Sequence, residues 1–353
     1  MPRYGREIDS HQLVWELAIT GEATIMLGWG NMGRVGGFRV GVGTPVDSAI
    51  ADLPQTPNRA ARQLAAIGRR SHQRRPTRGG IRVTPDAGFD GVLHFAASIE
   101  VAESVANPDK YWRNNIEGSL ALLRAIRAAG VPRLIFSSTG SMYTGDGKTA
   151  FDETAEVRPK NPYAATKATV DQLIAGECGA STTLGATSLR YFNAAGAVLT
   201  HDGVHLGERH DPESHLIPIL LQAASGRRPE FTLFGTDYET RDGACIRDYI
   251  HVADLATAHL LALDTVQPGR HDIYNLGNGE GFTNREVLDT VREVTGTDFP
   301  VRFVGRRPGD PAVCIASSDK ARRELGWKPK HTDLATIVGD AWQFYSSQCA
   351  QIH

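Results

Sequence analysis

Tyr163 and Lys167 stand four residues apart, directly after Pro162, so on a helix they share one face, one turn apart. An apolar stretch ending in Ser137, Ser138 and Thr139 precedes them, separated by a connection of about 20 residues. In a parallel α/β sheet, the carboxyl ends of strands and the amino ends of helices line the same crevice. Thr139 and Tyr163 are therefore expected to meet over one substrate hydroxyl, with Lys167 behind them. A Tyr–Lys pair at this spacing is also common on helix surfaces, and the preceding strand is what favours a site.

The chemistry expected of this pair is proton transfer. A tyrosine with a pKa of about 10 is only about 0.1% ionised at pH 7, and moving the pKa near 7 requires roughly 4 kcal/mol. One cation about 4 Å away supplies energy of that order at an effective dielectric constant near 20. We therefore predict that Tyr163 is a general base, and an acid in reverse, that Lys167 lowers its pKa, and that Thr139 orients the substrate oxygen.

Alternating apolar strands and helical stretches from about residue 90 predict an α/β fold, a doubly wound parallel sheet of the Rossmann-like type. Strands are expected at 91–97, 134–138, 186–193 and 273–276. Helices are expected from Asn107 to Gly130, after Pro162 and after a capping box at Thr283. We divide the chain into an N-terminal extension (1–20), a cofactor-type domain (21–194) and a smaller, discontinuous α/β substrate domain (195–353), parts of which return to the main sheet.

Glycines at positions 28, 30 and 33 have the spacing of a dinucleotide-binding loop, in which the backbone approaches a pyrophosphate at a helix amino terminus. The carboxylate expected about 20 residues further on is Asp52, or alternatively Asp47. The glycine-rich stretch that follows is a poor helix former, and such spacing also arises by chance in a chain with 37 glycines. The basic run 69–76 is interpreted as a solvated loop rather than a phosphate site.

A formal net charge of −2 gives no reason to expect a nucleic-acid partner, and we find no apolar run long enough to span a bilayer. The N-terminus carries acidic residues and no apolar core of a secretory signal. The four cysteines are widely separated, which indicates a reducing, cytoplasmic environment. Without a Cys-x-x-Cys pair, we predict no metal site.

From about residue 88 onward, the chain resembles the extended short-chain dehydrogenase/reductase family, and within it the UDP-glucose 4-epimerases. The segments that carry the resemblance are 94–97, 111–115, 136–139, 161–167, 189–193, 211–218, 234–238, 246–255, 274–279 and 306–312. They occur in one order over about 260 residues. The resemblance implies an NAD-dependent isomerase that acts on UDP-glucose and UDP-galactose.

The resemblance also implies roles for individual residues. Tyr163 is the expected catalytic base and Thr139 its hydroxyl partner. Lys167 is the expected partner of Tyr163 and ligand of the nicotinamide ribose, and the positively charged nicotinamide ring is expected to help Lys167 lower the pKa of Tyr163. The expected cofactor contacts are Gly28, Gly30, Gly33, Asp52, Ile81, Phe95, Ala96, Ala97, Ser98, Ile99, Asn114, Thr139, Tyr163, Lys167 and Phe192. The expected ligands of the nucleotide sugar are Asn193, His215, Thr232, Leu233, Phe234, Arg247, Arg307, Asp310 and Cys314. Guanidinium groups suit a diphosphate independently of any resemblance.

Dehydratases of this family carry an Asp-Glu pair after the Ser-Ser-Thr segment, where this chain has Gly140 and Ser141. The remaining reaction is transient oxidation. Tyr163 takes the proton of the sugar 4-hydroxyl while the C4 hydride passes to tightly held NAD. The resulting 4-keto sugar rotates in the pocket and is reduced on its other face. The resemblance aligns Cys314 with a pocket position that limits bulk on the sugar C2 substituent, and its modest size implies that N-acetylated sugars, as in UDP-GlcNAc, are also accepted.

The first 90 residues depart from the family pattern. Leu27 stands where the first motif glycine belongs, Gly80 replaces an adenine-binding aspartate beside Ile81, and about seven residues are missing before Phe95. This stretch is either a divergent cofactor domain or a shifted reading frame, and the second hypothesis is a catalytically dead protein that binds nucleotide sugars. The family also implies a homodimer; the apolar residues Leu120, Leu123 and Leu173 suit either a dimer interface or the core.

Overall fold

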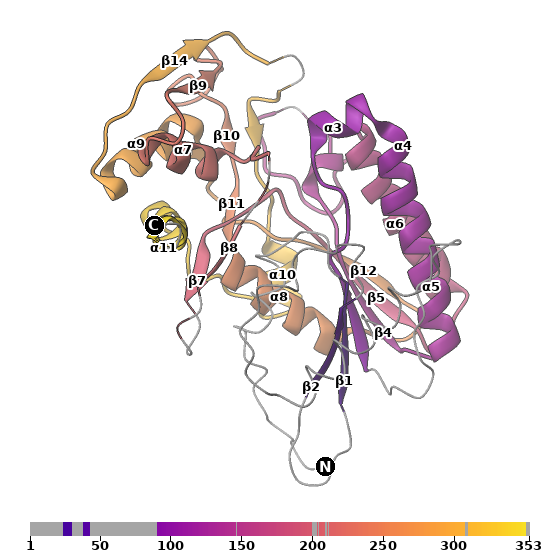
Figure 1. The fold of residues 1–353 in the computed structure, drawn as a ribbon. Coiled ribbons are helices and arrows are strands. Elements are labelled where there is room, and N and C mark those ends of the chain that lie inside the picture. Colours follow the sequence, from indigo (N-terminus) through magenta and orange to yellow (C-terminus); the bar gives the residue numbers. More distant parts are fainter. Residues whose placement is uncertain are drawn as a thin grey trace.

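The computed structural model describes residues 90–145, 147–199, 203, 205–208, 210, 212–307 and 310–350, together with the backbone of 24–29 and 38–42. Its main sheet has the strand order β12-β5-β4-β3-β1-β2 (Figure 1). The four parallel strands are β3 (Gly91–His94), β4 (Arg133–Ser137), β5 (Gly185–Arg190) and β12 (His271–Asn275). The predicted α/β class with a parallel sheet is confirmed, and β12 joins this sheet from far along the chain.

Both faces of the parallel strands are covered, because consecutive apolar residues alternate between them. Val92 and Leu134 pack with α5 and α6, whereas Leu93 and Ile135 pack with α8. The covering helices are α5 (Gly118–Ala129), α6 (Pro162–Gly179), α8 (Val252–Thr265) and α10 (Asp319–Glu324). Leu123 belongs to the first of these core clusters, and Leu173 packs against it, so both serve the core.

The helical stretch predicted from Asn107 to Gly130 is present but is not one regular helix. It consists of α4 (Pro108–Tyr111), a π-helical segment (Trp112–Glu117) and α5, and the short α3 (Val101–Ala106) precedes it. Gly130 ends α5 with φ 65°, a left-handed conformation that glycine adopts without strain. Asn107 occupies the N-cap position of α4, with Pro108 directly after it, but its side chain makes no capping hydrogen bond.

Helix α6 begins where the sequence predicts. The Asn161 side chain accepts a hydrogen bond from the Ala164 amide at 2.8 Å, and Pro162 occupies the first helical position. The short 3-10 helix η3 (Gly140–Met142) directly follows Thr139 after β4. Local sequence therefore fixes the start of the helix that carries Tyr163 and Lys167.

The second part of the chain packs around its own apolar core. Its helices are α7 (Leu216–Ala224), α9 (Asn284–Thr295) and α11 (Leu334–Ala350). Its short strands are β6 (Asn193–Ala195), β7 (Ala197–Leu199), β8 (His205–Gly207), β9 (Phe231–Phe234), β10 (Ile246–Arg247), β11 (Tyr249–His251), β13 (Phe282–Thr283), β14 (Val301–Val304) and β15 (Val313–Cys314). The capping box predicted at Thr283 and Glu286 opens α9, which is confirmed.

The outer strands β1 (Thr24–Trp29) and β2 (Phe38–Val42) are antiparallel, unlike the four strands beside them. In β1, Leu27 pairs with Gly91 at the start of β3, so the chain leaves β1 at the amino edge of the parallel strands. Gly28 lies inside this strand, paired with Arg39, and not in a loop at the carboxyl edge. The predicted loop geometry is absent at Gly28, and its role as a cofactor contact stays a prediction. Gly30, Gly33, Asp52 and Ile81 lie outside the described residues.

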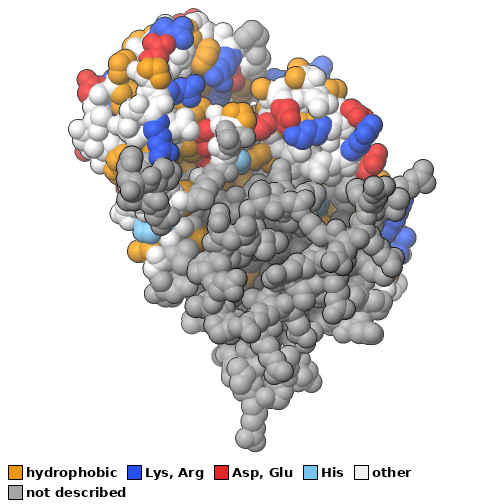
Figure 2. Space-filling view, in the orientation of Figure 1, with side chains coloured by type: hydrophobic (Ala, Val, Ile, Leu, Met, Phe, Trp, Pro, Cys, Tyr) orange, Lys and Arg blue, Asp and Glu red, His pale blue; other side chains and the backbone are white. Residues whose placement is uncertain are grey.

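Within the described part, no helix combines the length and apolar character needed to cross a bilayer. On the face shown in Figure 2, basic and acidic side chains are interspersed over the upper, described part.

Candidate active site

The candidate site lies at the carboxyl edge of the parallel strands, where three chain segments meet. Residues 95–99 follow β3, Thr139 follows β4, and Phe192 follows β5. The amino end of α6 brings Tyr163 and Lys167 to this edge. Parallel strands place their connecting loops on one side of the sheet, which explains why segments far apart in sequence converge here.

Tyr163 and Thr139 meet at this edge. Their side chains share a hydrogen bond, and Thr139 also accepts one from the Ser141 amide at 3.1 Å. Burial raises the pKa of Tyr163 well above its ordinary value, and the hydrogen bond from Thr139 opposes that rise. The phenol of the unliganded chain is therefore protonated at neutral pH and is aligned with the hydroxyl predicted to orient the substrate.

Lys167 is buried one turn further along α6. Its ammonium donates to the Ser137 carbonyl at 2.7 Å and lies 4.7 Å from the centre of the Phe136 ring. Burial lowers the pKa of Lys167 to about 8, although Asp171, one turn further on, opposes the shift. An ammonium group has three N–H donors, so the single hydrogen bond within the described part leaves two for a ligand's hydroxyls.

Asn115 ties the 95–99 segment to α6, and we did not predict its role. It is 2% exposed; it accepts from the Ser98 amide at 2.7 Å and donates to the Ser98 carbonyl and to Thr166. Its neighbour Asn114, a predicted cofactor contact, is exposed and donates to Ser98 Oγ at 3.1 Å. Asn115 could have been found from the sequence, because it stands beside Asn114 in the same matched segment.

A second buried network underlies Lys167, and it too was missed. The Ser137 hydroxyl lies 2.9 Å from the Tyr191 hydroxyl and 3.1 Å from Nε2 of His259. Asp171 accepts two hydrogen bonds from Arg190, at 2.8 and 3.0 Å. The sequence held two signals, the four-residue spacing of Lys167 and Asp171 and the matched segments that contain Ser137, Arg190 and Tyr191. Only His259 lies outside both.

Phe192 closes the space beside Gly140. A Cβ atom built on Gly140 would lie 2.7 Å from the Phe192 ring, which is far closer than carbon atoms approach without displacement. No acidic side chain fits at this position while Phe192 keeps its place. The structure thus gives a steric reason for the missing carboxylate after Thr139.

Predicted ligands of the nucleotide sugar lie in the second part, on several short strands. Asn193 donates to the Asp248 carbonyl at 2.8 Å, which joins β6 to the end of β10. In β9, Leu233 is 1% exposed and belongs to the core, so its side chain does not face a ligand and only its backbone remains available. Thr232 and Phe234 alternate with it and are partly exposed. The guanidinium of Arg307 stacks 3.8 Å from the centre of the Phe234 ring.

Arg247, Asp310 and Cys314 are close to one another. Arg247 in β10 is the register partner of Cys314 in β15. Its guanidinium lies 3.5 Å from Asp310 and donates to the carbonyls of Ile246 and Pro311. The structure therefore brings three of the predicted nucleotide-sugar ligands into one place, with the arginine oriented by fixed acceptors.

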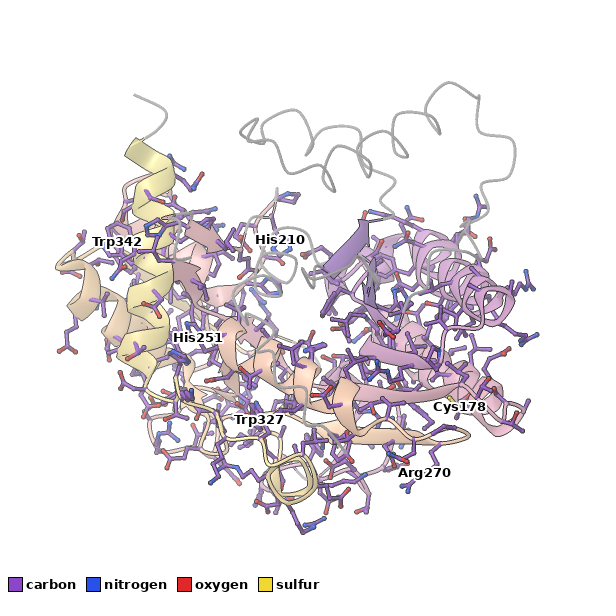
Figure 3. The ribbon with its side chains drawn as sticks, turned by 90° about the horizontal axis from the view of Figure 1, so that it is seen from below. Cys178, His210, His251, Arg270, Trp327 and Trp342 are labelled. Carbon is purple, nitrogen blue, oxygen red and sulfur yellow. The ribbon has the colours of Figure 1, made fainter. Side chains whose placement is uncertain are left out.

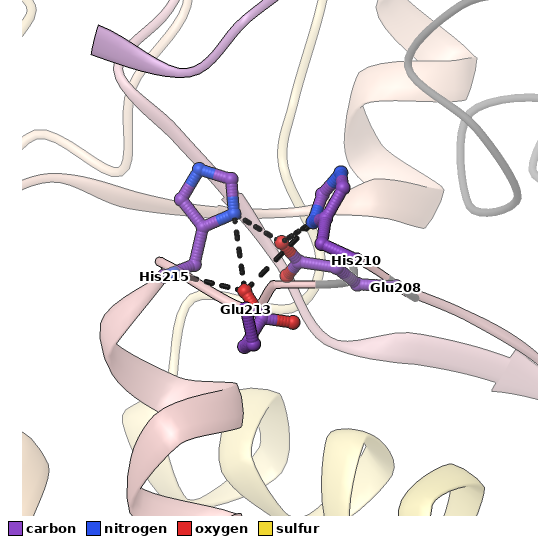
Figure 4. A group of neighbouring side chains, drawn as sticks. All are labelled: Glu208, His210, Glu213 and His215. Carbon is purple, nitrogen blue, oxygen red and sulfur yellow. Dashed lines mark hydrogen bonds and ion pairs between the residues drawn. The ribbon is translucent and has the colours of Figure 1, made fainter. Parts of the chain in front are cut away.

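His215, the last predicted ligand, precedes the first residue of α7 and contacts Glu208 (Figure 4). The adjacent carboxylates of Glu208 and Glu213 raise the pKa of His210 to about 10. Burial alone would raise the pKa of Glu208, but His210 and His215 outweigh that effect and hold it at about 2. Glu208 and His215 also line a pocket with Asn193 and Tyr249.

Comparison with known proteins relates the chain to one group of enzymes. Residues 65–277 match the model of the NAD dependent epimerase/dehydratase family. The chain is 55% identical to a UDP-glucose 4-epimerase of Streptomyces lividans over 259 residues, which is 73% of this chain and 76% of the other.

Solved structures agree with this relationship. The UDP-glucose-4-epimerase of Stenotrophomonas maltophila with bound NAD and formylated UDP-arabinopyranose superposes with a TM-score of 0.71 at 40% identity, covering 76% of this chain and 79% of the other. The UDP-Glc/GlcNAc 4-epimerase of Campylobacter jejuni gives a TM-score of 0.63 at 39% identity, covering 73% and 78%.

Proposed function

The chain belongs to the NAD dependent epimerase/dehydratase family, and we propose that it interconverts UDP-glucose and UDP-galactose with Tyr163 as the acid–base residue. Its relatives are UDP-glucose 4-epimerases, which are isomerases. The observation that carries the residue assignment is the hydrogen bond between Tyr163 and Thr139, one helical turn from a buried Lys167. These three groups can orient one sugar hydroxyl and move its proton.

NAD is the cofactor of this family, and related structures contain it. The described residues fit its nicotinamide-ribose end. Ala96 and Ala97 are small enough for a ligand to approach the backbone, and Lys167 keeps donors for ribose hydroxyls. The residues predicted for the adenosine end are Gly30, Gly33, Asp52 and Ile81, which lie outside the described part. Bound NAD supplies a hydride acceptor and a positive charge beside the phenol.

Tyr163 performs the proton transfer in this proposal. It accepts the proton of the sugar 4-hydroxyl when C4 is oxidised and returns it when the 4-keto sugar is reduced on the opposite face. Because burial raises the pKa of Tyr163, the phenolate forms only when enough positive charge faces it, and Lys167 supplies one buried cation on the same helix. Tyr163 therefore acts as a base only when the cofactor is bound. Thr139 holds the substrate oxygen in line with the phenol.

Gly140 supports epimerisation over dehydration. A dehydratase needs a further acid to expel a hydroxyl, and the Phe192 ring occupies the space such a side chain would require.

The proposed nucleotide-sugar site consists of Asn193, His215, Thr232, the Leu233 backbone, Phe234, Arg247, Arg307, Asp310 and Cys314. Arg247 and Arg307 bind the diphosphate, since planar guanidinium groups match phosphate oxygens. Cys314 leaves room for an N-acetyl group, and one similar structure is that of a UDP-Glc/GlcNAc 4-epimerase.

We further propose that the protein works in the cytoplasm as a homodimer. The division into an extension (1–20), an NAD domain (21–194) and a substrate domain (195–353) is retained as a proposal. Exposed apolar side chains of α3 and the π-helical segment, namely Val101, Val105 and Trp112, are compatible with a dimer interface.

The deciding experiment combines cofactor content with turnover. Purified protein is expected to carry or to bind NAD, detected by absorbance and fluorescence, and to convert UDP-galactose to UDP-glucose. The antiparallel course of β1 favours a second function, a catalytically dead protein that binds nucleotide sugars. UDP binding without NAD binding or conversion, even with added NAD, would select that second function.

A further inference from the structure

Four side chains in one short stretch of the second part converge on a common point. Glu208 follows β8, and Glu213 and His215 directly precede α7, with His210 between them. The four ligand-type atoms, one from each residue, all lie within 4.8 Å of one another. Figure 4 shows both imidazole rings turned so that Nδ1 faces the two carboxylates. Figure 3 shows His210 on the side of the second part that faces the main sheet.

The distances are close to those of one coordination sphere. Tetrahedral zinc with bonds of about 2.0–2.2 Å sets its donor atoms about 3.3–3.6 Å apart. His210 Nδ1 lies 2.9 Å from Glu208 Oε1 and 3.8 Å from Glu213 Oε1, and His215 Nδ1 also lies 3.8 Å from Glu213 Oε1. Both contacts of Glu208, with His210 and with His215, are tighter than this, so an ion requires the Glu208 carboxylate to move back.

One buried nitrogen atom of the cluster lacks a well-oriented hydrogen-bond partner. His210 Nδ1 is enclosed by protein and makes no hydrogen bond of acceptable geometry, although Glu208 Oε1 is 2.9 Å away. Buried polar atoms are seldom left without a partner. Coordination to a metal satisfies such a nitrogen without a proton between the two atoms. The side chain of Glu213 is only 6% exposed, and its Oε1 accepts hydrogen bonds from the amides of Ser214 and His215 at 2.8 and 2.9 Å. A cation would add to these donors in offsetting the solvation cost of the buried carboxylate.

We propose that Glu208, His210, Glu213 and His215 bind one zinc-type divalent cation. Two imidazole nitrogens and two carboxylate oxygens form a donor set that suits zinc better than calcium or magnesium, which prefer oxygen alone. The ion ties the segment after β8 to the start of α7, beside the pocket that Glu208 and His215 line with Asn193. Nδ1 of His215 faces the two carboxylates, and Nε2 points away from them (Figure 4). This site shares His215 with the proposed nucleotide-sugar site and takes no part in the proposed proton transfer.

The test is direct titration of the full chain, stripped of metal with a chelator, with zinc sulfate in a calorimeter. We expect one equivalent of zinc per chain and an upward shift in thermal unfolding temperature as zinc is added. Glu213→Gln, which keeps the size of the side chain, and His210→Ala are expected to weaken binding at least tenfold, because even outer partners of a metal are worth about 10- to 100-fold. His205→Ala, on the same segment but outside the cluster, is the matched control and is expected to bind as the parent does.

A measurement on the unmodified chain guards against variants that fail to fold. Cobalt(II) added to the stripped protein is expected to develop the intense visible absorption of tetrahedral nitrogen–oxygen coordination, and zinc is expected to displace it. The proposal is overturned if the parent chain binds no zinc, if cobalt keeps its octahedral spectrum, or if folded His210→Ala binds zinc as tightly as the parent.

Discussion

The acid–base centre and the diphosphate region differ in how their side chains are held. In the first, Thr139 and Lys167 are each 3% exposed, and their partners come from β4, the η3 turn that follows it and α6. In the second, Arg247 is partly buried between two short strands, while Arg307 is exposed and rests on the ring of Phe234. The side chains of the acid–base centre are buried and held by hydrogen bonds, whereas Arg307 of the diphosphate region is exposed and held by stacking on a ring.

This difference indicates a division of work between the two parts. A buried ammonium with a lowered pKa and a phenol with a raised pKa are costly to the fold and are suited to chemistry. Exposed or half-buried guanidinium groups keep their charge and can engage and release a diphosphate. Changes in the first region are therefore expected to act on kcat, and changes in the second on KM.

The largest effect is expected from Tyr163→Phe. Loss of the phenolic hydroxyl removes general acid–base catalysis, which is worth about 10²- to 10⁴-fold, so kcat should fall by that order while UDP affinity is unchanged. Tyr274→Phe, which alters a hydroxyl bonded to Glu324 far from the centre, is the control and should keep the parent kcat. Near-parent turnover of Tyr163→Phe would remove Tyr163 from the mechanism.

Lys167→Met is expected to separate activity from stability. Activity should fall at least about 100-fold, yet the free energy of unfolding at pH 7 should rise by about 2 kcal/mol. A pKa lowered to about 8 means that the buried charge of Lys167 destabilises the fold, and methionine removes that destabilisation. The loss of the hydrogen bond to Ser137 reduces this gain.

The sign follows from proton binding. Between pH 8 and 10.5 the native Lys167 loses its proton while the unfolded side chain keeps it, so the parent gains stability as pH rises through this window. Denaturant unfolding of both proteins from pH 7 to pH 10.5 checks this: the advantage of Lys167→Met should shrink with rising pH. A constant or growing difference would contradict a lowered pKa for Lys167.

Arg247→Ala tests the diphosphate region. Removing a charged hydrogen-bond donor costs about 1.5–3 kcal/mol, so KM for UDP-galactose should rise roughly 10- to 150-fold with little change in kcat. Arg270→Ala, an exposed arginine paired with Asp272, is the matched control and should leave KM unchanged. A fall in kcat with constant KM in Arg247→Ala would contradict the proposal that the diphosphate region acts on KM and the acid–base centre on kcat.

The smallest effect is expected from Cys314→Tyr. Cys314 lies beside Arg247 in the β10–β15 pair, and a larger side chain there should crowd the sugar C2 substituent. The ratio of kcat/KM for UDP-GlcNAc to that for UDP-glucose should fall about tenfold, the scale of a steric change in a pocket. If the parent chain does not turn over UDP-GlcNAc at all, the prediction that Cys314 admits N-acetylated sugars is wrong.

Much of the fold was predictable because its signals are local. The strands β3, β4, β5 and β12 follow from short apolar runs. The starts of α6 and α9 follow from Asn161-Pro162 and from the capping box at Thr283. The direction of β1 was not predictable, because its pairing partner and orientation depend on contacts with β3 some 60 residues away.

The sequence by itself determined that Tyr163 and Lys167 share one face of a helix, since a four-residue spacing on α6 needs only the helical repeat. The sequence also predicted that Thr139 meets Tyr163, because parallel strands and their helices share one edge of the sheet. The structure shows that two glutamates and two histidines within residues 208–215 face one point, in a chain for which no metal site was predicted. Tertiary structure alone decided that the Ser137 carbonyl holds Lys167 and that Phe192 fills the space at Gly140. Short-range geometry is set by neighbouring residues, whereas these last two contacts exist only once distant segments have packed.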